Sequence, residues 1–420
     1  MATTDLSNDQ PGLRTVDGQP LKAALARASR HARIRAFVLV MPLLLFVLLT
    51  FAVPIGQMLS RSFTDDKFSS NMPEMRAWFA ANGKATPDES AFAALTADLI
   101  VASEQKTAGS IGTRINYEIP GTRSMFTGAA RAAKRLEPPY KDAILALDKD
   151  WARADIWAAM RLASAPVTLN FYQAALDRQI GVSGTFEAAP ETNRIYVKLF
   201  LRTFMLSVVI TGLCLLLGFP VAHLLATLPL RHASLLMILV LLPFWTSLLV
   251  RTTSWMVLLQ GQGVINNVLV SLGIISEDGR LAMMYNQTGT IIAMTHILLP
   301  FMILPLYSVM KTIPPSYARA ARSLGATSWT TFRRIYLPQT VSGIGAGGIL
   351  CFILAVGYYI TPALVGGADG TLISNQIAFH MQKSLNWSLA AALAAMLLAA
   401  VLVLYWAYDR MVGIDNMKLG

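Results

Sequence analysis

The sequence predicts an all-α integral membrane protein with six transmembrane helices. Hydrophobic residues make up 54% of the chain and charged residues only 14%, which is not the composition of a soluble globular domain. A transmembrane helix needs about 20 mainly apolar residues. Runs of this kind are 36–60, 203–230, 232–250, 281–310, 335–368 and 384–408. An even number of spans places both termini on the same side of the membrane.

Basic residues select that side. The N-terminal tail 1–35 carries more basic than acidic residues, and the connection 311–334 carries basic residues and no acid. Loops rich in Lys and Arg stay in the cytoplasm. We therefore expect the tails 1–35 and 413–420 to be cytoplasmic. The formal net charge of +11 is then explained by contact with the anionic lipid bilayer, with no need for a nucleic-acid partner.

The first apolar run is interpreted as a retained first transmembrane helix, 36–58. Basic residues precede it, as they do in a secretion signal, but the preceding tail is long and no A-x-A cleavage pattern follows. The segment 59–195 separates this helix from the second span. Because its flanking spans are oriented by the cytoplasmic basic loops, we expect the whole segment to be extracytoplasmic.

Three stretches of this segment predict helices, so it is expected to be a small helical insertion. They are 91–105, 140–164 and 167–178. Trp151, Trp157 and Tyr172 are expected in its core, whereas Trp78 looks exposed. Two roles stay open for the insertion: a structural cap on the spans, and a docking surface for an external partner.

Motifs of catalysis are missing from the sequence. It has no G-x-x-x-x-G-K-[ST] phosphate loop, no H-E-x-x-H zinc motif and no G-x-S-x-G nucleophile turn. The predicted spans contain no Asp or Glu, so the carboxylate relay of a proton-driven transporter is absent. Cys214 and Cys351 lie inside predicted spans, without a disulfide framework or nearby metal ligands. We predict no catalytic residue, no metal site and no cofactor in this chain.

The cytoplasmic loop 312–340 is the most informative segment. Ser316 is a plausible N-cap for a short helix that continues to Leu324, and Gly325 stands where a left-handed residue would end it. A second short helix is predicted for 329–336, ending at Leu337-Pro338. A polar, basic, helical loop between two spans indicates contact with a cytoplasmic partner.

This loop resembles the EAA loop of ABC importer permeases. The family pattern is a Glu-Ala-Ala triplet, a glycine four residues after the second Ala, and an Ile-x-Leu-Pro ending. The matching residues are Arg319, Ala320, Ala321, Gly325, Ile335, Leu337 and Pro338. Only the acidic first position, here Arg319, departs from the pattern.

The resemblance implies the type I importer permease fold in a bacterial inner membrane, with 196–412 as the permease core. It also implies partners: a cytoplasmic ATPase dimer that binds ATP and Mg and grips the 316–325 helix, a second permease subunit, and an extracytoplasmic solute-binding protein. The stretch Gly343 to Gly348 contains a small-xxx-small pair, which predicts close helix packing, either within the chain or against the second permease.

Other segments resemble spermidine/putrescine permeases in particular. These are the stretch from Pro243 to Asn267 and the sequence from Thr361 to Gly367. The candidate residues of a substrate path are Trp245, Arg251, Trp255, Tyr358, Tyr359 and Thr361. Aromatic faces can hold an ammonium group, but Tyr358 and Tyr359 suit a membrane-interface belt equally well. Polyamine permeases often carry an acid just before the Thr-Pro pair, where this chain has Ile360.

Alternatives therefore stay open. Opines, other amino compounds or small organic ions could replace a polyamine as the substrate. An integral membrane enzyme with its active site in the insertion is a function of another class, and a channel or scaffold is a third. Neither the enzyme nor the channel or scaffold function explains the cytoplasmic loop.

Overall fold

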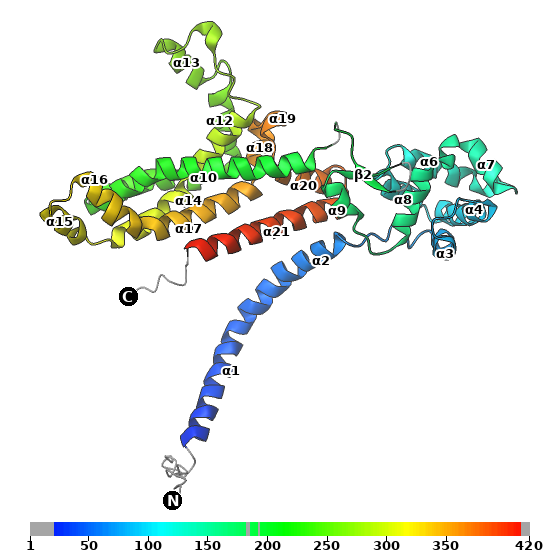
Figure 1. Cartoon of the computed structure of the whole chain (residues 1–420), viewed down its shortest axis with the longest axis horizontal. Coiled ribbons are helices and arrows are strands. Elements are labelled where there is room, and N and C mark those ends of the chain that lie inside the picture. The colour runs from blue at the N-terminus through cyan, green and yellow to red at the C-terminus, as the bar shows by residue number, and fades with distance from the viewer. Residues whose placement is uncertain (1–20, 182–184, 192–193, 413–420) are drawn as a thin grey trace, which may run out of the picture. The chain divides into compact units, whose positions relative to one another are not determined.

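The computed structural model describes residues 21–181, 185–191 and 194–412 (Figure 1). The predicted tail 413–420 and most of the basic tail lie outside these residues. The chain divides into two compact units, Met1–Ser60 and Arg61–Gly420.

The first unit is a single apolar helical segment. It consists of α1 (Leu21–Val47), a π-helical turn (Leu48–Ala52) and the start of α2 (Val53–Arg61). The stretch Ser29–Arg61 is long and apolar enough to cross a membrane. The predicted first span is therefore confirmed as a helix, and it begins earlier than residue 36.

The insertion opens the second unit with seven short helices and one hairpin among its described residues. They are α3 (Pro73–Asn82), α4 (Glu89–Glu104), α5 (Ala108–Asn116), α6 (Thr122–Ala132), α7 (Tyr140–Leu147), α8 (Ala154–Ser164), α9 (Asn170–Ala175), β1 (Arg178–Ile180) and β2 (Phe186–Ala188). The predicted helix 91–105 is confirmed, and the Asp88 side chain caps it by accepting the Ala91 N–H at 3.1 Å. The predicted helix 140–164 is broken, because Asp148 and Arg153 adopt extended conformations on either side of the 3₁₀ turn Lys149–Ala152.

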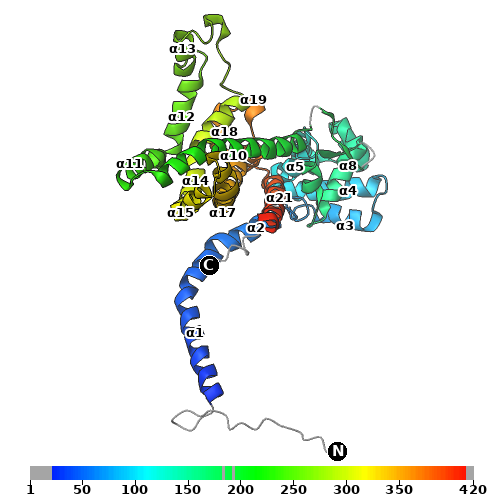
Figure 2. The ribbon, with the colours of Figure 1, turned by 60° about the vertical axis from the view of Figure 1, so that its left-hand side comes forward.

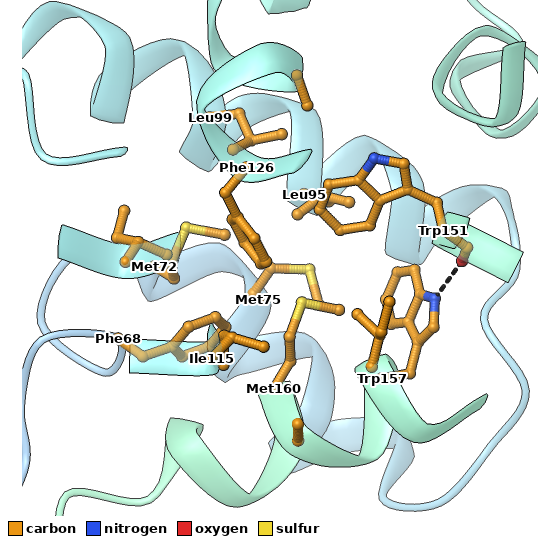
Figure 3. Close-up of a cluster of buried hydrophobic side chains, with 14 of the residues drawn as sticks. Phe68, Met72, Met75, Leu95, Leu99, Ile115, Phe126, Trp151, Trp157 and Met160 are labelled. Atoms are coloured by element: carbon orange, nitrogen blue, oxygen red, sulfur yellow. Dashed lines mark hydrogen bonds between the residues drawn. The ribbon is translucent and has the colours of Figure 1, made fainter. Parts of the chain in front are cut away.

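Aromatic and methionine side chains fill the core of the insertion (Figure 3). Trp151 and Trp157 are buried, as expected, and the Trp157 indole N–H donates to the Trp151 carbonyl at 2.7 Å (Figure 3). The expectation for Trp78 was wrong, since only 8% of this residue is exposed. Its ring lies edge-on against Trp157, and its N–H donates to Ser90 Oγ at 2.9 Å. The burial of Trp78 therefore depends on Trp157, which is far from it in the sequence.

A buried carboxylate joins the first two helices of this core. Asp98 on α4 accepts the backbone N–H groups of Glu74 and Met75 at the start of α3, at 3.2 and 2.8 Å. Burial raises the pKa of Asp98 to about 6, although these two hydrogen bonds act in the opposite direction.

The C-terminal part of the insertion packs on the helices that follow residue 195. Phe171 and Ala175 of α9 share a hydrophobic cluster with Leu199, Ile373 and Leu393. At the same level, the buried Asp177 carboxylate accepts the N–H groups of residues 195–197 at 2.9–3.1 Å and so caps the first turn of the next helix. The insertion is thus attached at the N-terminal end of that helix.

The core contains further helices within 194–412. They are α10 (Tyr196–Thr227), α11 (Leu230–Leu241), α12 (Leu248–Leu259), α13 (Val264–Ser271), α14 (Gln287–Thr312), α15 (Pro315–Ser323), α16 (Ser328–Thr331), α17 (Leu337–Gly357), α18 (Ile360–Val365), α19 (Gly367–Gly370), α20 (Ile373–Gln382) and α21 (Trp387–Val412). Figures 1 and 2 show α10, α14 and α17 side by side, with α12 and α13 projecting from them.

Small residues let α17 approach α14 closely. A Cβ atom on Gly343 would lie 3.2 Å from Leu306 Cα, and one on Gly347 would lie 3.1 Å from the Met302 carbonyl oxygen. The expected small-xxx-small packing is therefore realised within the chain. The centre of this contact is apolar, with Cys214, Met302 and Cys351 fully buried.

Two of the predicted spans, 232–250 and 335–368, differ most from the observed helices. The predicted helix 232–250 is broken, because Leu230–Trp245 and Leu248–Ser271 meet at an angle of 98°. Thr246 and Ser247 are extended there, and the Ser247 hydroxyl accepts the Val250 N–H at 3.2 Å to cap α12. The predicted span 335–368 is observed as Ser328–Gly357. Among the described residues, five helices can cross a membrane, or six if the bent pair is one span.

Candidate functional site

The short helix α15 begins and ends with strong local signals. Pro314 is the N-cap residue and Pro315 occupies the first turn, where its missing N–H costs nothing. Ser316 is therefore inside the helix, and its prediction as the N-cap was wrong. Gly325 has φ +86°, as expected. The Gly325 N–H donates to the Arg322 carbonyl and the Ala326 N–H to the Ala321 carbonyl, at 3.0 and 3.1 Å, which is the Schellman pattern.

The surface of α15 is basic and has apolar edges. Arg319, Ala320 and Arg322 are exposed, and Ala321 is half-buried. Leu324 exposes 89% of its surface and Trp329 exposes 68%. Within 311–334 no acidic residue is present. Among the residues that the structure describes, no ion pair involves Arg319 or Arg322. Large exposed apolar side chains beside cations without an ion pair are typical of a protein-binding surface.

A cleft of about 590 Å³ lies beside this helix. Its walls come from the C-terminal ends of α10 and α14, from α15 and from the segment before α17. The lining includes His223, Thr227, Lys311, Tyr317, Arg319, Arg322, Ile335 and Tyr336. Lys311 Nζ donates to the Ala226 carbonyl at 3.4 Å. The cleft therefore lies between the loop and the C-terminal ends of α10 and α14.

The last part of the loop continues directly into the membrane helix. After α16, residues Phe332–Tyr336 form a π-helical turn that leads without a break into α17. The predicted stop at Leu337-Pro338 was wrong. Pro338 stands in the first turn of α17, and the wider turn before it, with a Leu337 N–H to Phe332 carbonyl bond, accommodates the missing proline donor.

The candidate substrate-path residues are brought together only in part. The hydroxyls of Thr252 and Thr361 lie 3.2 Å apart, and the Trp255 indole N–H donates to His296 Nδ1 at 3.1 Å. Arg251 is close enough to interact electrostatically with His296 and Tyr358. Its buried Nε has no hydrogen-bond partner among the described residues.

The other two path candidates, Trp245 and Tyr359, differ from this group because they are exposed. Trp245 exposes 77% of its surface at the end of the 3₁₀ turn Leu242–Trp245, and Tyr359 exposes 39%. His296 was not among the candidate path residues. Its contact with Trp255, 41 residues away, has no local sequence signal. No group of three or more potential metal ligands occurs among the described residues.

The second half of the chain matches a known protein family. A family model described as "Binding-protein-dependent transport system inner membrane component" matches residues 199–412. The chain belongs to this family. It is therefore a non-catalytic, multi-pass inner-membrane subunit of an ABC importer, and the family implies partner ATPase subunits and a periplasmic binding protein.

Individual permeases agree with this assignment. The spermidine/putrescine transport system permease protein PotB of Haemophilus influenzae is 34% identical over 227 residues, which cover 54% of this chain and 79% of PotB. PotB of Escherichia coli is 36% identical over 220 residues, covering 52% and 79%. The E. coli inner membrane ABC transporter permease protein YdcU is 33% identical over 230 residues, covering 51% and 71%. A solved bacterial importer of the polysaccharide alginate has 20% identity and a TM-score of 0.43, covering 53% of this chain and 80% of its own.

Proposed function

We propose that this permease forms part of the import path for a polyamine such as putrescine or spermidine. The observation that supports the substrate class is the identity of 34–36% to permeases named for spermidine and putrescine. The test is uptake of labelled putrescine and spermidine by proteoliposomes that contain the whole importer. Saturable, ATP-dependent uptake is the expected result. Absence of uptake of both by a complex that hydrolyses ATP would remove the polyamine assignment.

A second candidate is an amino compound that also carries a carboxylate, such as an opine. The buried Nε of the Arg251 cation has no hydrogen-bond partner among the described residues. His296 accepts from Trp255 at Nδ1, so a neutral His296 presents a donor at Nε2. The hydroxyl of Thr252, next in sequence to Arg251, and that of Thr361, 3.2 Å from it, are further polar groups, and the predicted spans contain no Asp or Glu. This set favours an anionic group over an ammonium. Competition of unlabelled amino acids and opines with putrescine uptake distinguishes the two candidates.

The coupling role is proposed for α15 and the residues that end it. A cytoplasmic ATPase dimer, which binds ATP and Mg, would grip the 316–325 segment, while Ile335, Leu337 and Pro338 join it to α17. The exposed Arg319 and the cleft beside it support this role. A second permease subunit, either a homologue or another copy, would complete the translocation path.

Charge reversal at Arg319 and Arg322 is expected to weaken co-purification of the ATPase subunits. The loop lacks acids, so the partner surface should supply carboxylates. Exposed ion pairs contribute about 0–1 kcal/mol each, so the double reversal is expected to weaken association several-fold, and more at low than at high salt. Reversal of Arg333 and Arg334, which changes the charge equally, is the control and should have little effect. Unchanged association of the Arg319→Glu, Arg322→Glu variant would mean that the contact is apolar.

We propose a six-span topology in which both termini are cytoplasmic and the insertion 59–195 is extracytoplasmic. The 32 residues of α10 extend about 48 Å, which exceeds the thickness of the bilayer core. Asp177 of the insertion caps the first turn of α10, whereas Ala226 and Thr227 at its other end line the cleft beside α15. Opposite ends of one spanning helix lie on opposite sides of the membrane, which supports this topology.

Cysteine labelling in intact cells checks that topology. A cysteine in place of the exposed Ser124 of α6 is expected to react with a membrane-impermeant thiol reagent. One in place of the exposed Ser323 of α15 is expected to react only after the cells are permeabilised. The native Cys214 and Cys351 are buried and should stay unlabelled. Labelling of Ser323→Cys before permeabilisation would reverse the proposed topology.

A further inference from the structure

Three aromatic rings form a ladder that runs from the exposed loop into the bundle. The Trp329 and Phe332 rings stack with centroids 5.8 Å apart and an angle of 24°, and Phe332 and Tyr336 stack at 6.2 Å and 26°. Their sequence spacing of three and four residues places them on one helical face. Trp329 exposes 68% of its surface, whereas Phe332 and Tyr336 are half-buried.

The inner end of the ladder contacts α10 at two places. The Phe332 ring lies edge-on to Phe219 with centroids 5.9 Å apart and an angle of 87°. The Tyr336 hydroxyl lies 2.9 Å from His223 Nδ1, and the two rings are also edge-on. The residue that follows Phe219 is Pro220, which lies inside α10 and removes one backbone hydrogen bond from it. The ladder therefore contacts α10 where that helix bends most easily.

The ladder and α15 face each other across a small cleft. This cleft, of about 240 Å³, is lined by Ala318 and Arg322 of α15 and by His223, Phe332 and Tyr336. Only the four residues 324–327 connect α15 to α16, and the Thr327 side chain caps α16 by accepting the Thr330 N–H. A displacement of α15 thus reaches the ladder through a short, capped connection, and α15 has space to move toward the rings.

We infer that Phe332 and Tyr336 are positioning residues that carry the displacement of α15 to α10 at Phe219 and His223. The π-helical turn Phe332–Tyr336 suits this role, because π turns inside helices are found frequently at functional sites. The inference rests on the proposed coupling role of α15, but it assigns the route beyond the ATPase contact. The membrane-side receiver is α10, whose other end is capped by the insertion.

The test measures uptake and ATP hydrolysis together in proteoliposomes with the assembled importer. Phe332→Leu keeps an apolar residue but removes all three ring contacts of Phe332, with Trp329, Tyr336 and Phe219. Uptake per ATP hydrolysed is expected to fall about tenfold, within the usual range of coupling between sites, while the ATPase subunits stay bound. Phe204→Leu is the matched control, since it removes one ring of the stacked Phe204–Phe352 pair elsewhere on α10 and α17. It should leave uptake per ATP unchanged.

A double-mutant cycle tests the route with smaller changes. Tyr336→Phe and His223→Gln each break the hydroxyl–imidazole contact and are each expected to lower uptake per ATP about threefold. The double variant should lose no more uptake per ATP than either single variant, because both substitutions remove the same contact. The inference would be overturned if the double variant lost the product of the two single losses, or if Phe332→Leu kept parental uptake per ATP.

Failure of the inference is distinguishable from failure of the proposed function. Loss of ATPase subunits from Phe332→Leu would assign the ladder to docking and overturn its role as a relay. If instead the Arg319→Glu, Arg322→Glu variant binds the ATPase normally while the ladder variants still uncouple transport, the docking proposal fails and the ladder does not. If instead the ladder variants keep parental uptake per ATP while the Arg319→Glu, Arg322→Glu variant fails to bind the ATPase, the ladder inference fails and the docking proposal does not.

Discussion

Uptake by the assembled importer is expected to fall at least about tenfold when Gly325 is replaced by valine, with the amount of protein in the membrane unchanged. Gly325 has φ +86°, a conformation that costs a β-branched residue about 1–3 kcal/mol. A Cβ atom at this position would meet nothing within 4 Å, so the effect comes from the backbone rather than from a clash. Loss of the Schellman turn would let α15 continue and redirect Ala326 and Thr327.

The measurement is uptake of labelled substrate by proteoliposomes, with the ATPase activity of the same preparation. Gly83→Val is the matched control. Gly83 also has a positive φ, +59°, and also has free space around a Cβ atom, but it ends α3 in the insertion. This variant should suffer similar local strain and keep its transport. Parental uptake by Gly325→Val would mean that the loop is not the coupling element.

Replacement of Arg114 by alanine is expected to destabilise the insertion by about 3–5 kcal/mol. Arg114 is fully buried, pairs with Asp65 at 3.5 Å and with Glu118 at 3.1 Å, and lies over the Phe171 ring at 4.8 Å. Its removal leaves two carboxylates without a counter-charge in a site from which water is excluded. Asp65 also accepts the Ser388 hydroxyl of α21 at 3.4 Å, so the loss of stability should extend from the insertion to α21.

Amide hydrogen exchange of the purified full-length protein measures this loss as a lower opening free energy for α5 and α9. Lys134→Ala is the control, because it also removes an ion pair, with Glu104 at 2.9 Å. Both of those side chains are more than half exposed, so the control should change stability by less than about 1 kcal/mol. Equal effects of the two variants would contradict a buried, structurally required Arg114.

The candidate site was predictable where its signals are local. Gly325 ends α15 because a left-handed residue is needed after the last helical turn, and that need is visible in a window of a few residues. The matched motif from Arg319 to Pro338 also identified the family that the comparison then supported. The aromatic ladder was missed, although its spacing is regular, because its contacts to Phe219 and His223 join residues 113 apart.

The sequence by itself determined that the chain is a helical membrane protein, since the length and polarity of its apolar runs must match the bilayer. It also determined the helical character of the insertion, because capping and apolar spacing act within one or two turns. Tertiary structure alone decided that Trp78 is buried, that the third apolar run bends by 98°, and that α17 continues through Pro338. Each of these outcomes depends on distant neighbours that supply burial, caps or space, and a single stretch of sequence does not contain them.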